Sequence, residues 1–157
     1  YFRLALNQGK DLICLSDEIN HVRQYLFIQK QRYGEKLEYE IDENPAFDNL
    51  VLPKLVLQPL VENALYHGIK EKEGQGHIKV SVQKTDTGLV VRIEDDGIGF
   101  QVAGDSSQSN LKRGGVGLQN VDQRLKLHFG GNYQMKIDSA PEKGTTVEIY
   151  INRIETS

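Results

Sequence analysis

The sequence predicts an α+β fold, a two-layer α/β sandwich in which a mixed sheet carries helices on one face. Five segments alternate apolar and polar residues with the period of a strand, and four of them form two pairs joined by short turns. Segments with a helical period precede and separate these strands. A chain of 157 residues can bury one core, so a single sheet with covering helices accounts for the whole pattern.

Composition excludes several classes of protein. Hydrophobic residues make up 38% of the chain and charged residues 26%, which is typical of a globular protein and not of a disordered one. The net charge is −3, so no basic field predicts a nucleic-acid partner. Cys14 is the single cysteine, which excludes an internal disulfide and favours a reducing compartment. No apolar run is long enough to span a bilayer, and we expect a chain that starts at Tyr1 to be a fragment.

A helix and a strand are the first predicted elements. Residues 16–33 have a helical period, with Ser16 as the expected N-cap and Gly34 as the expected end. The apolar stripe of this helix consists of Leu15, Ile19, Val22, Leu26 and Tyr33. Residues 1–12 are expected to be the tail of another helix, and the alternation over residues 37–41 predicts a strand.

A second predicted helix carries the first candidate functional residues. Pro59 suits the first turn of a helix, which we expect to run to His67 and to stop at Gly68. The apolar face of this helix is formed by Leu60, Val61, Ala64 and Leu65. Asn63 lies beside that face, next to Glu62, and has two interpretations. It either satisfies a neighbouring backbone group or provides an oxygen ligand for a hard cation such as Mg²⁺, which takes few protein ligands.

A predicted hairpin ends in a candidate binding motif. The runs 78–82 and 89–93 alternate around a turn at residues 86–88, and the alternation continues onto Asp95. A carboxylate on the core side of a strand is unfavourable unless something pairs with it, so Asp95 is a candidate acceptor for an exocyclic amine. Residues 95–100, Asp-Asp-Gly-Ile-Gly-Phe, would let the backbone approach a ligand closely. The alternative is a tight turn with solvated acids.

The third candidate motif joins a loop to a helix. Residues 97–117 are polar, rich in glycine and without a period, so we expect a mobile loop. Residues 112–118, Lys-Arg-Gly-Gly-Val-Gly-Leu, end this loop before a helix with Leu118, Val121, Leu125 and Phe129 on one face. Two cations, exposed amides and the helix start would form an anion cradle. The alternative is a flexible linker.

The three motifs together favour a nucleotide site. The chain closes with a predicted hairpin of residues 133–137 and 147–151, which completes the sheet. A magnesium ligand, an acceptor for an amine and a phosphate cradle are the parts that a nucleoside triphosphate requires. They occur in order around one predicted sheet, and this conjunction is more specific than any single motif.

The same segments resemble the nucleotide-binding boxes of the superfamily that contains gyrase, Hsp90, MutL and histidine kinases. Residues 57–64 resemble the asparagine box, residues 95–100 the Asp-x-Gly-x-Gly box, residues 115–118 the second glycine box, and residues 144–146 the closing Gly-Thr box. More narrowly, LQPLVENAxxHG, GVGLQNVDQRL and YLFIQKQRYGEKL are similar to bacterial LytS-type sensor histidine kinases. The resemblance covers nearly the whole chain.

This resemblance implies a Bergerat-type ATP-binding fold and assigns roles to residues. Asn63 would hold Mg²⁺, Asp95 would accept from the adenine amino group, and Thr145 would assist through water. Glu62 and Asn63 are the catalytic candidates. The other positions implied to bind ATP are His67, Gly97, Gly99, Phe100, Lys112, Arg113, Gly115, Gly117 and Leu118.

The resemblance also implies a place in a larger protein. Residues 34–157 would be the ATP-binding catalytic domain of a two-component sensor histidine kinase, and residues 1–33 a helical remnant leading to dimerisation and phosphoacceptor helices. The chain lacks a run like Asn-Pro-His-Phe, so we expect the acceptor histidine on a missing segment. A response regulator, a homodimer and a cytoplasmic position beneath the bacterial inner membrane are the further implied properties.

Two departures from the superfamily pattern keep other functions open. Pro59 stands where gyrase-like ATPases have the glutamate that activates water, which disfavours hydrolysis as the main activity. Tyr66 replaces a lysine found in many relatives and removes one expected phosphate contact. The alternatives are a gyrase- or Hsp90-like ATP-hydrolysing conformational module and a degenerate relay domain without kinase activity. A purely structural α+β protein would make the matched boxes a coincidence.

Overall fold

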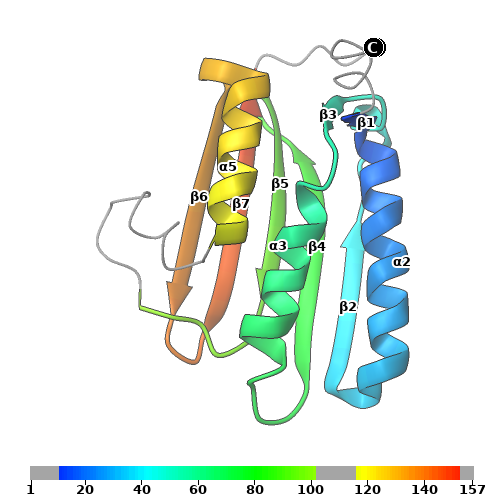
Figure 1. Cartoon of the computed structure of the whole chain (residues 1–157), viewed down its shortest axis with the longest axis vertical. Helices are drawn as coiled ribbons and strands as arrows, with labels where there is room; N and C mark the ends of the chain where they lie inside the picture. The colour runs from blue at the N-terminus through cyan, green and yellow to red at the C-terminus, as the bar shows by residue number, and fades with distance from the viewer. Residues whose placement is uncertain (1–10, 102–115, 153–157) are drawn as a thin grey trace.

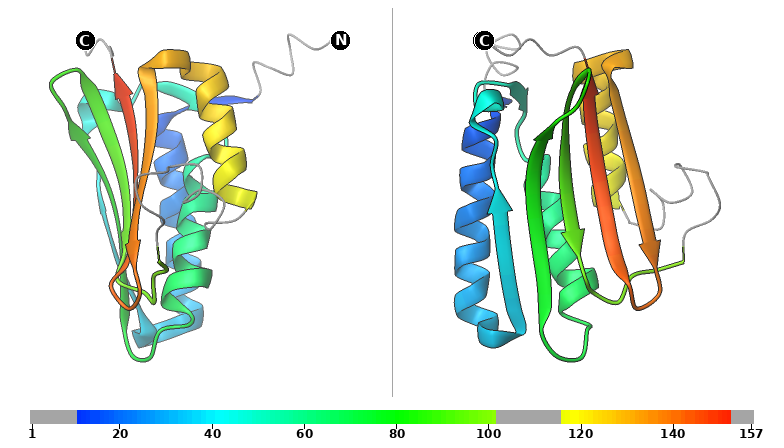
Figure 2. Two further views of the ribbon diagram at one scale, coloured as in Figure 1. Left: turned by 90° about the vertical axis from the view of Figure 1, so that its left-hand side faces the viewer. Right: turned by 180° about the vertical axis from the view of Figure 1, so that it is seen from behind.

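The predicted two-layer architecture is confirmed. The computed structural model describes residues 11–101 and 116–152 of the chain. In this part of the chain, a five-stranded mixed sheet carries its helices on one face (Figures 1 and 2). The helices are α2 (Leu15–Tyr33), α3 (Leu57–Asn63), its continuation η3 (Ala64–Ile69) and α5 (Val116–Phe129). The strands of this sheet are β2 (Leu37–Asp42), β4 (Gly76–Lys84), β5 (Gly88–Asp95), β6 (Tyr133–Ala140) and β7 (Gly144–Asn152). Short 3₁₀ turns cover Gly34–Lys36, Pro45–Phe47 and Gly130–Asn132.

The strand order β2-β4-β5-β7-β6 follows from the connections between strands. Strand β2 pairs with β4 in parallel, because the chain crosses over the sheet through α3 between them. The other neighbours pair antiparallel, and both predicted hairpins are formed, with Val82 opposite Val91 and Met135 opposite Ile149. Strand β5 is the central strand of the sheet, so its C-terminal end lies between the ends of its neighbours β4 and β7.

All three helices pack on a common core with the sheet. Leu26 of α2, Val61 of α3 and Leu125 of α5 are fully buried in one hydrophobic cluster with the inward residues of β4, β5 and β7. The predicted stripe of α2 is confirmed in Leu15, Ile19, Val22 and Leu26. Helix α2 packs in the same core as the elements that follow it. The predicted division of the chain into residues 1–33 and residues 34–157 remains a prediction.

The start of the described chain differs from the prediction. Leu12–Cys14 forms strand β1, which pairs antiparallel with β3 (Val51–Pro53), so the expectation of a helix reaching residue 12 is wrong. Residues 1–10 lie outside the described residues. Helix α2 begins at Leu15 and its N-cap is Cys14, not Ser16. The backbone amides of Leu15 and Ser16 donate to carbonyl oxygens of residues 50 and 48, and this tertiary contact replaces the predicted side-chain cap.

Helix α3 begins two residues before Pro59 and does not stop at Gly68. It continues as the wider π-helix η3, in which the amide of Lys70 donates to the carbonyl of Leu65, five residues earlier, at 2.8 Å. A Cβ atom on Gly68 would lie 2.6 Å from the Oδ1 atom of Asp95. The glycine therefore serves close packing against β5 and not helix termination.

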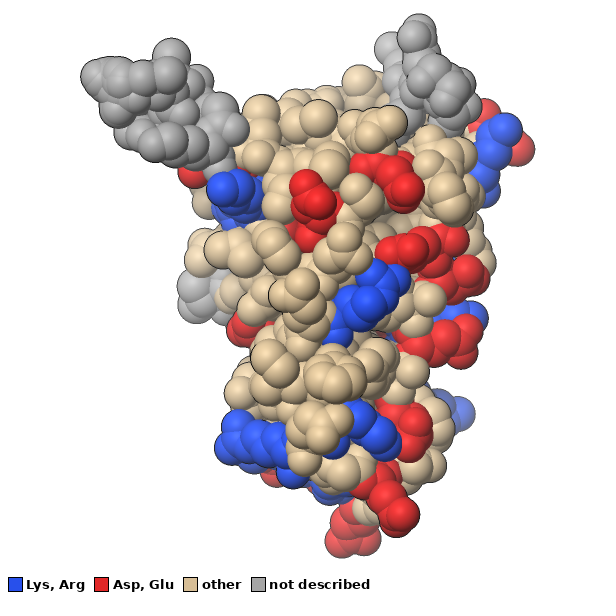
Figure 3. Space-filling view, turned by 90° about the vertical axis from the view of Figure 1, so that its right-hand side faces the viewer, with Lys and Arg blue, Asp and Glu red and all other residues tan. Residues whose placement is uncertain are grey.

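Charges of both signs are interspersed over the edge of the molecule formed by α2 and β2 (Figure 3). On this side Arg23 pairs with Glu43 at 2.7 Å and Lys30 pairs with Glu38 at 2.6 Å. These pairs are partly exposed and contribute little to stability. Among the helices that the structure describes, none has both the length and the apolar content needed to cross a bilayer.

Candidate functional site

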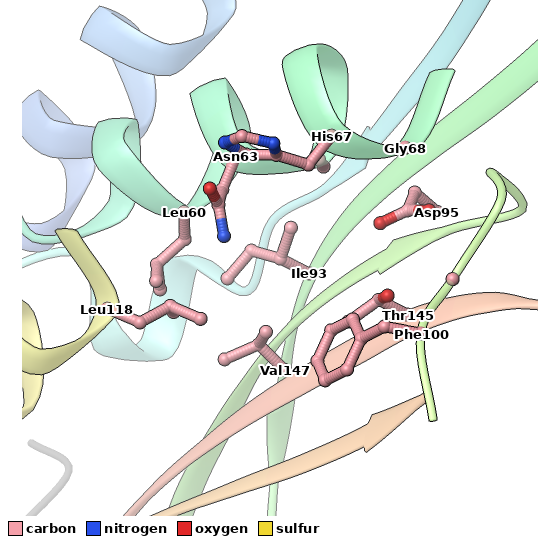
Figure 4. A pocket seen from close by; sticks show the side chains of 12 residues that line it. Leu60, Asn63, His67, Gly68, Ile93, Asp95, Phe100, Leu118, Thr145 and Val147 are labelled. Atoms are coloured by element: carbon pink, nitrogen blue, oxygen red, sulfur yellow. The ribbon is translucent and has the colours of Figure 1, made fainter. Parts of the chain in front are cut away.

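A cavity of about 260 Å³ lies between α3–η3 and the ends of strands β5 and β7. Its apolar lining consists of Leu60, Ala64, Ile93, Phe100, Leu118 and Val147. The polar side chains that line it are Asn63, His67, Asp95 and Thr145 (Figure 4). The volume is just under the usual range for pockets of drug-sized ligands, so the cavity would enclose one end of a larger molecule.

Asp95 lies where the sequence predicts, at the end of the central strand and on the side of the helices. It pairs in register with Thr145 of β7, and both side chains face the cavity (Figure 4). The amide of Gly97 donates to the Oδ1 atom of Asp95 at 2.8 Å. The backbone of Gly68 packs so closely against this carboxylate that a side chain at residue 68 would displace it. Asp95 is therefore held in one orientation by its surroundings.

The electrostatic state of Asp95 differs from that of its neighbour. Burial raises the pKa of Asp95 to about 6, although the backbone amides of Gly97 and Thr145 act in the opposite direction. Asp96 is partly buried too, but hydrogen bonds from the backbone and ring of His77 and from Lys72 hold the pKa of Asp96 below its usual value. A carboxylate with a pKa raised by burial inside a cavity indicates a functional site.

The loop after Asp95 requires its glycines. A Cβ atom on Gly97 would lie 2.3 Å from the backbone of Gly68, so the loop packs directly against η3. Gly99 has a φ of +64°, and a Cβ atom there would lie 2.0 Å from the carbonyl oxygen of Ala140. This close backbone packing directs Phe100 into the lining of the cavity, and a role of Phe100 in binding a nucleotide remains a prediction.

Ser139 is a residue of the site region that the sequence motifs do not include. Its hydroxyl accepts from the amide of Phe100 at 2.8 Å, donates to the carbonyl of Gly144 at 3.0 Å, and lies 2.8 Å from the hydroxyl of Thr145. Ser139 is buried and links both loops beside the cavity. The alternation of strand β6 places Ser139 on the core side. A polar residue at a core position of a strand end indicates a candidate site residue, as it does for Asp95.

Asn63 and His67 form the opposite side of the cavity. They are one helical turn apart. Asn63 points from the helix into the cavity, and the ring of His67, which also lines the cavity, extends along the helix beside Asn63 (Figure 4). Within residues 11–101 and 116–152, no group of three His, Cys, Asp or Glu side chains could hold a metal ion. A single amide oxygen is compatible with Mg²⁺, because this ion usually keeps several waters and binds substrate phosphates.

Several predicted site residues are not brought into the cavity. Glu62 does not line it; its Oε1 atom accepts from the side-chain amide of Gln58 at 3.0 Å. Gly117 lies in the first turn of α5 with open space around it, one residue before Leu118, which does line the cavity. Lys112, Arg113 and Gly115 lie outside the described residues. The roles of all five remain predictions.

Two family models match the sequence. The model described as "Histidine kinase-, DNA gyrase B-, and HSP90-like ATPase" matches residues 49–154, which include both sides of the cavity. The model described as "Histidine kinase" matches residues 1–37.

Individual relatives agree with the family models. The chain is 39% identical over 145 residues to YwpD of Bacillus subtilis, covering 89% of this chain and 50% of the relative. It is 33% identical over 149 residues to the sensor histidine kinase YesM of Bacillus subtilis, covering 95% and 25%. It is 31% identical over 157 residues to the sensor protein LytS of the same organism, covering 96% and 26%. The chain thus spans between a quarter and a half of the length of these relatives.

A solved structure has the same fold. The histidine kinase domain of a blue-light activated histidine kinase from Erythrobacter litoralis aligns with a TM-score of 0.65 at 19% sequence identity. The alignment covers 89% of this chain and 61% of that chain. At this identity the similarity supports the architecture of sheet and helices.

Proposed function

The chain belongs to the histidine kinase-, DNA gyrase B- and HSP90-like ATPase family, and we propose that it is the ATP-binding catalytic domain of a two-component sensor histidine kinase. The resemblance to LytS-type sensor kinases is confirmed by the relatives. The proposed reaction is transfer of the γ-phosphoryl group of ATP to a histidine on a segment outside this chain. In this proposal the domain supplies nucleotide binding and phosphate positioning.

The observation that carries the proposal is the orientation of Asp95. Its carboxylate faces the cavity from the central strand, flanked by an apolar wall that suits a flat heterocycle. In the proposal this carboxylate accepts a hydrogen bond from the adenine amino group, and Thr145 assists through water. A buried acceptor of this kind discriminates strongly, because a base without the amino group would leave it unpaired.

The opposite side of the cavity would face the phosphates. We assign to Asn63 the role of a magnesium ligand, with His67 beside it at the rim. Mg²⁺ would neutralise phosphate charge, and phosphoryl transfer depends mainly on such neutralisation and on positioning. Lys112 and Arg113 are proposed to approach the phosphates from the loop before α5. Glu62 remains a catalytic candidate, although in this structure its carboxylate accepts from Gln58 and does not line the cavity.

The wider setting is also part of the proposal. The sensor histidine kinase YesM and the sensor protein LytS are about four times longer than the matched region, so the acceptor histidine and dimerisation helices would belong to other parts of the protein. A response regulator would then receive the phosphoryl group. The proposal also places the parent protein in the inner membrane, with this domain on the cytoplasmic side, as an expectation from the resemblance to sensor histidine kinases.

Nucleotide titration tests the proposal most directly. We expect isothermal titration to detect ATP binding that strengthens with Mg²⁺ and that is retained by ADP but weakened for GTP. An absence of heat with ATP at millimolar concentration would refute the proposed site.

Two activity assays separate the kinase from its alternatives. We expect transfer of radiolabelled phosphate from ATP to a supplied acceptor segment, with negligible release of free phosphate. Rapid phosphate release without transfer would favour the ATP-hydrolysing module. Binding with neither activity would favour a relay domain that only reports nucleotide occupancy.

A further inference from the structure

A short turn before α3 has an unusual pattern of backbone hydrogen bonds. Residues 54–56 connect β3 to α3, and Leu55 has a φ of +57°, in the left-handed region that non-glycine residues rarely adopt. Hydrogen bonds tie the backbone of this turn to other elements of the fold. The amide of Lys54 donates to the carbonyl of Asp11 at 2.8 Å. A turn held in this way takes its position from its neighbours.

Glu18 of α2 holds the amide side of the turn. Its side chain is fully buried, and it accepts from three consecutive backbone amides. The Oε1 atom accepts from the amide of Leu55 at 3.1 Å, and the Oε2 atom accepts from those of Val56 and Leu57 at 2.7 and 2.8 Å. These amides lie at the start of α3, where the helix itself provides no acceptor, so Glu18 acts as a cap supplied by another helix.

Arg124 of α5 holds the carbonyl side of the same turn. Its guanidinium donates to the carbonyl oxygen of Leu55 at 3.1 Å and to that of Lys54. The turn is therefore hydrogen-bonded to α2 through its amides and to α5 through its carbonyls. Figure 1 shows the chain passing from β3 to α3 between these two helices. Asn63 lies in the helix that starts here, and Leu118 lies in α5 six residues before Arg124; both line the cavity.

We propose that Glu18 is a positioning residue for the nucleotide site and that it acts, together with Arg124, through the turn 54–56. Glu18 sets where α3 begins, and thereby where Asn63 meets the cavity. Arg124 ties the same point to the helix that carries Leu118. A movement of α2 would change nucleotide affinity through this link. The inference rests on the proposed ATP site and adds to it a connection to the N-terminal helix.

The test measures MgATP affinity in folded protein. Glu18→Gln keeps the size of the side chain but leaves one acceptor oxygen for three amides, and Arg124→Gln removes the grip of α5. We expect each variant to bind MgATP about fivefold to tenfold more weakly, measured by titration at a temperature where circular dichroism shows the variant to be folded. Because both act on one turn, the double variant should lose less affinity than the product of the single losses.

Asp17→Asn is the matched control. Asp17 also lies in the first turn of α2, so its substitution removes the same favourable interaction with the helix dipole without touching the turn 54–56. We expect its MgATP affinity to equal that of the unmodified protein.

The outcomes are distinguishable. Unchanged affinity in folded Glu18→Gln and Arg124→Gln, however far the melting temperature falls, would overturn the inference and leave the ATP site intact. If Glu18→Gln does not fold, Arg124→Gln decides the question, because Arg124 is only half-buried. If the unmodified chain itself does not bind MgATP, the proposed function fails, and the inference that rests on it fails with it.

Discussion

The two ends of the cavity are built in different ways. At the Asp95 end, backbone packs against backbone, since neither Gly68 nor Gly97 has room for a side chain, and Ser139 connects the two neighbouring loops. At the Asn63 end, the lining comes from two side chains of one helix, Asn63 and His67. The first end is shaped by the fold before any ligand arrives. In the proposed function, the side chains at the second end would contact a cation and phosphates.

In the proposed function, this difference would separate recognition of the base from phosphoryl transfer. A preformed acceptor can select one base, because a wrong group leaves a buried carboxylate unpaired. At the Asn63 end, binding would depend on the charges of the cation and the phosphates, so affinity there would change when the phosphates change. Substitutions at the Asp95 end should therefore weaken nucleotide binding equally with and without Mg²⁺. Substitutions at the Asn63 end should weaken binding mainly when Mg²⁺ is present.

Gly68→Ala should have the largest effect on the preformed end. The added methyl would lie 2.6 Å from the Oδ1 atom of Asp95 and force that carboxylate out of position. We expect nucleotide affinity to fall by more than about a hundredfold, in titrations with and without Mg²⁺. Gly131→Ala is the control, because nothing lies within 4 Å of its added Cβ and no predicted site includes it, and it should bind normally. Normal binding by Gly68→Ala would show that this end is not rigid.

Asp95→Asn should have the next largest effect. The amide keeps the shape of the side chain but offers a donor where the adenine amino group would need an acceptor. We expect a loss of roughly tenfold to a hundredfold in affinity for ATP and adenosine alike, measured by competition with a fluorescent nucleotide. Equal affinity of the variant and the unmodified protein would remove Asp95 from the proposed site.

Lower pH should weaken binding at the same end. The pKa of Asp95 is raised to about 6 in the ligand-free protein, so the carboxylate is ionised at pH 7.5 and mostly protonated at pH 5. The protonated group loses acceptor capacity, and adenosine affinity should fall by up to about tenfold between these pH values. Adenosine is the probe because it has no titrating phosphate. A flat profile in unmodified protein, or an unchanged slope in Asp95→Asn, would contradict this expectation.

Asn63→Ala should have the smallest effect and the most selective one. It removes one amide oxygen from an ion that keeps most of its ligands as water and phosphate oxygens. We expect about a fivefold loss of affinity for MgATP and little change for ATP in the presence of a chelator. Equal losses under both conditions would count against a magnesium ligand at residue 63.

The pattern of the sheet could be predicted from the sequence because alternation is local. The inward direction of Asp95 follows from the same alternation that places Val91 and Ile93 in the core, and the register of both hairpins follows from short turns. Ser139 was missed even though its strand carries the same signal, because no motif drew attention to it.

Other features depend on contacts between distant parts of the chain. Glu18 meets Val56 across 38 positions, and no local period of either segment indicates this contact. Gly68 was interpreted as a helix stop because glycine often ends helices, and only its contact with Asp95 reveals the packing role. The sequence also does not indicate that the carbonyls of residues 48 and 50 cap α2, because every residue has a backbone carbonyl whatever its side chain.

The π-helical turn η3 constrains how this segment can change its length. A wide turn accommodates one residue more than an α-helical turn, and each residue added to or removed from a helix rotates the downstream part of that helix by about 100°. Deleting one residue between Asn63 and Gly68 would regularise the helix but swing the glycine away from β5, and a side chain would then press on Asp95. Natural insertions and deletions should therefore be excluded from this segment and tolerated beyond Lys70, where the chain turns toward β4.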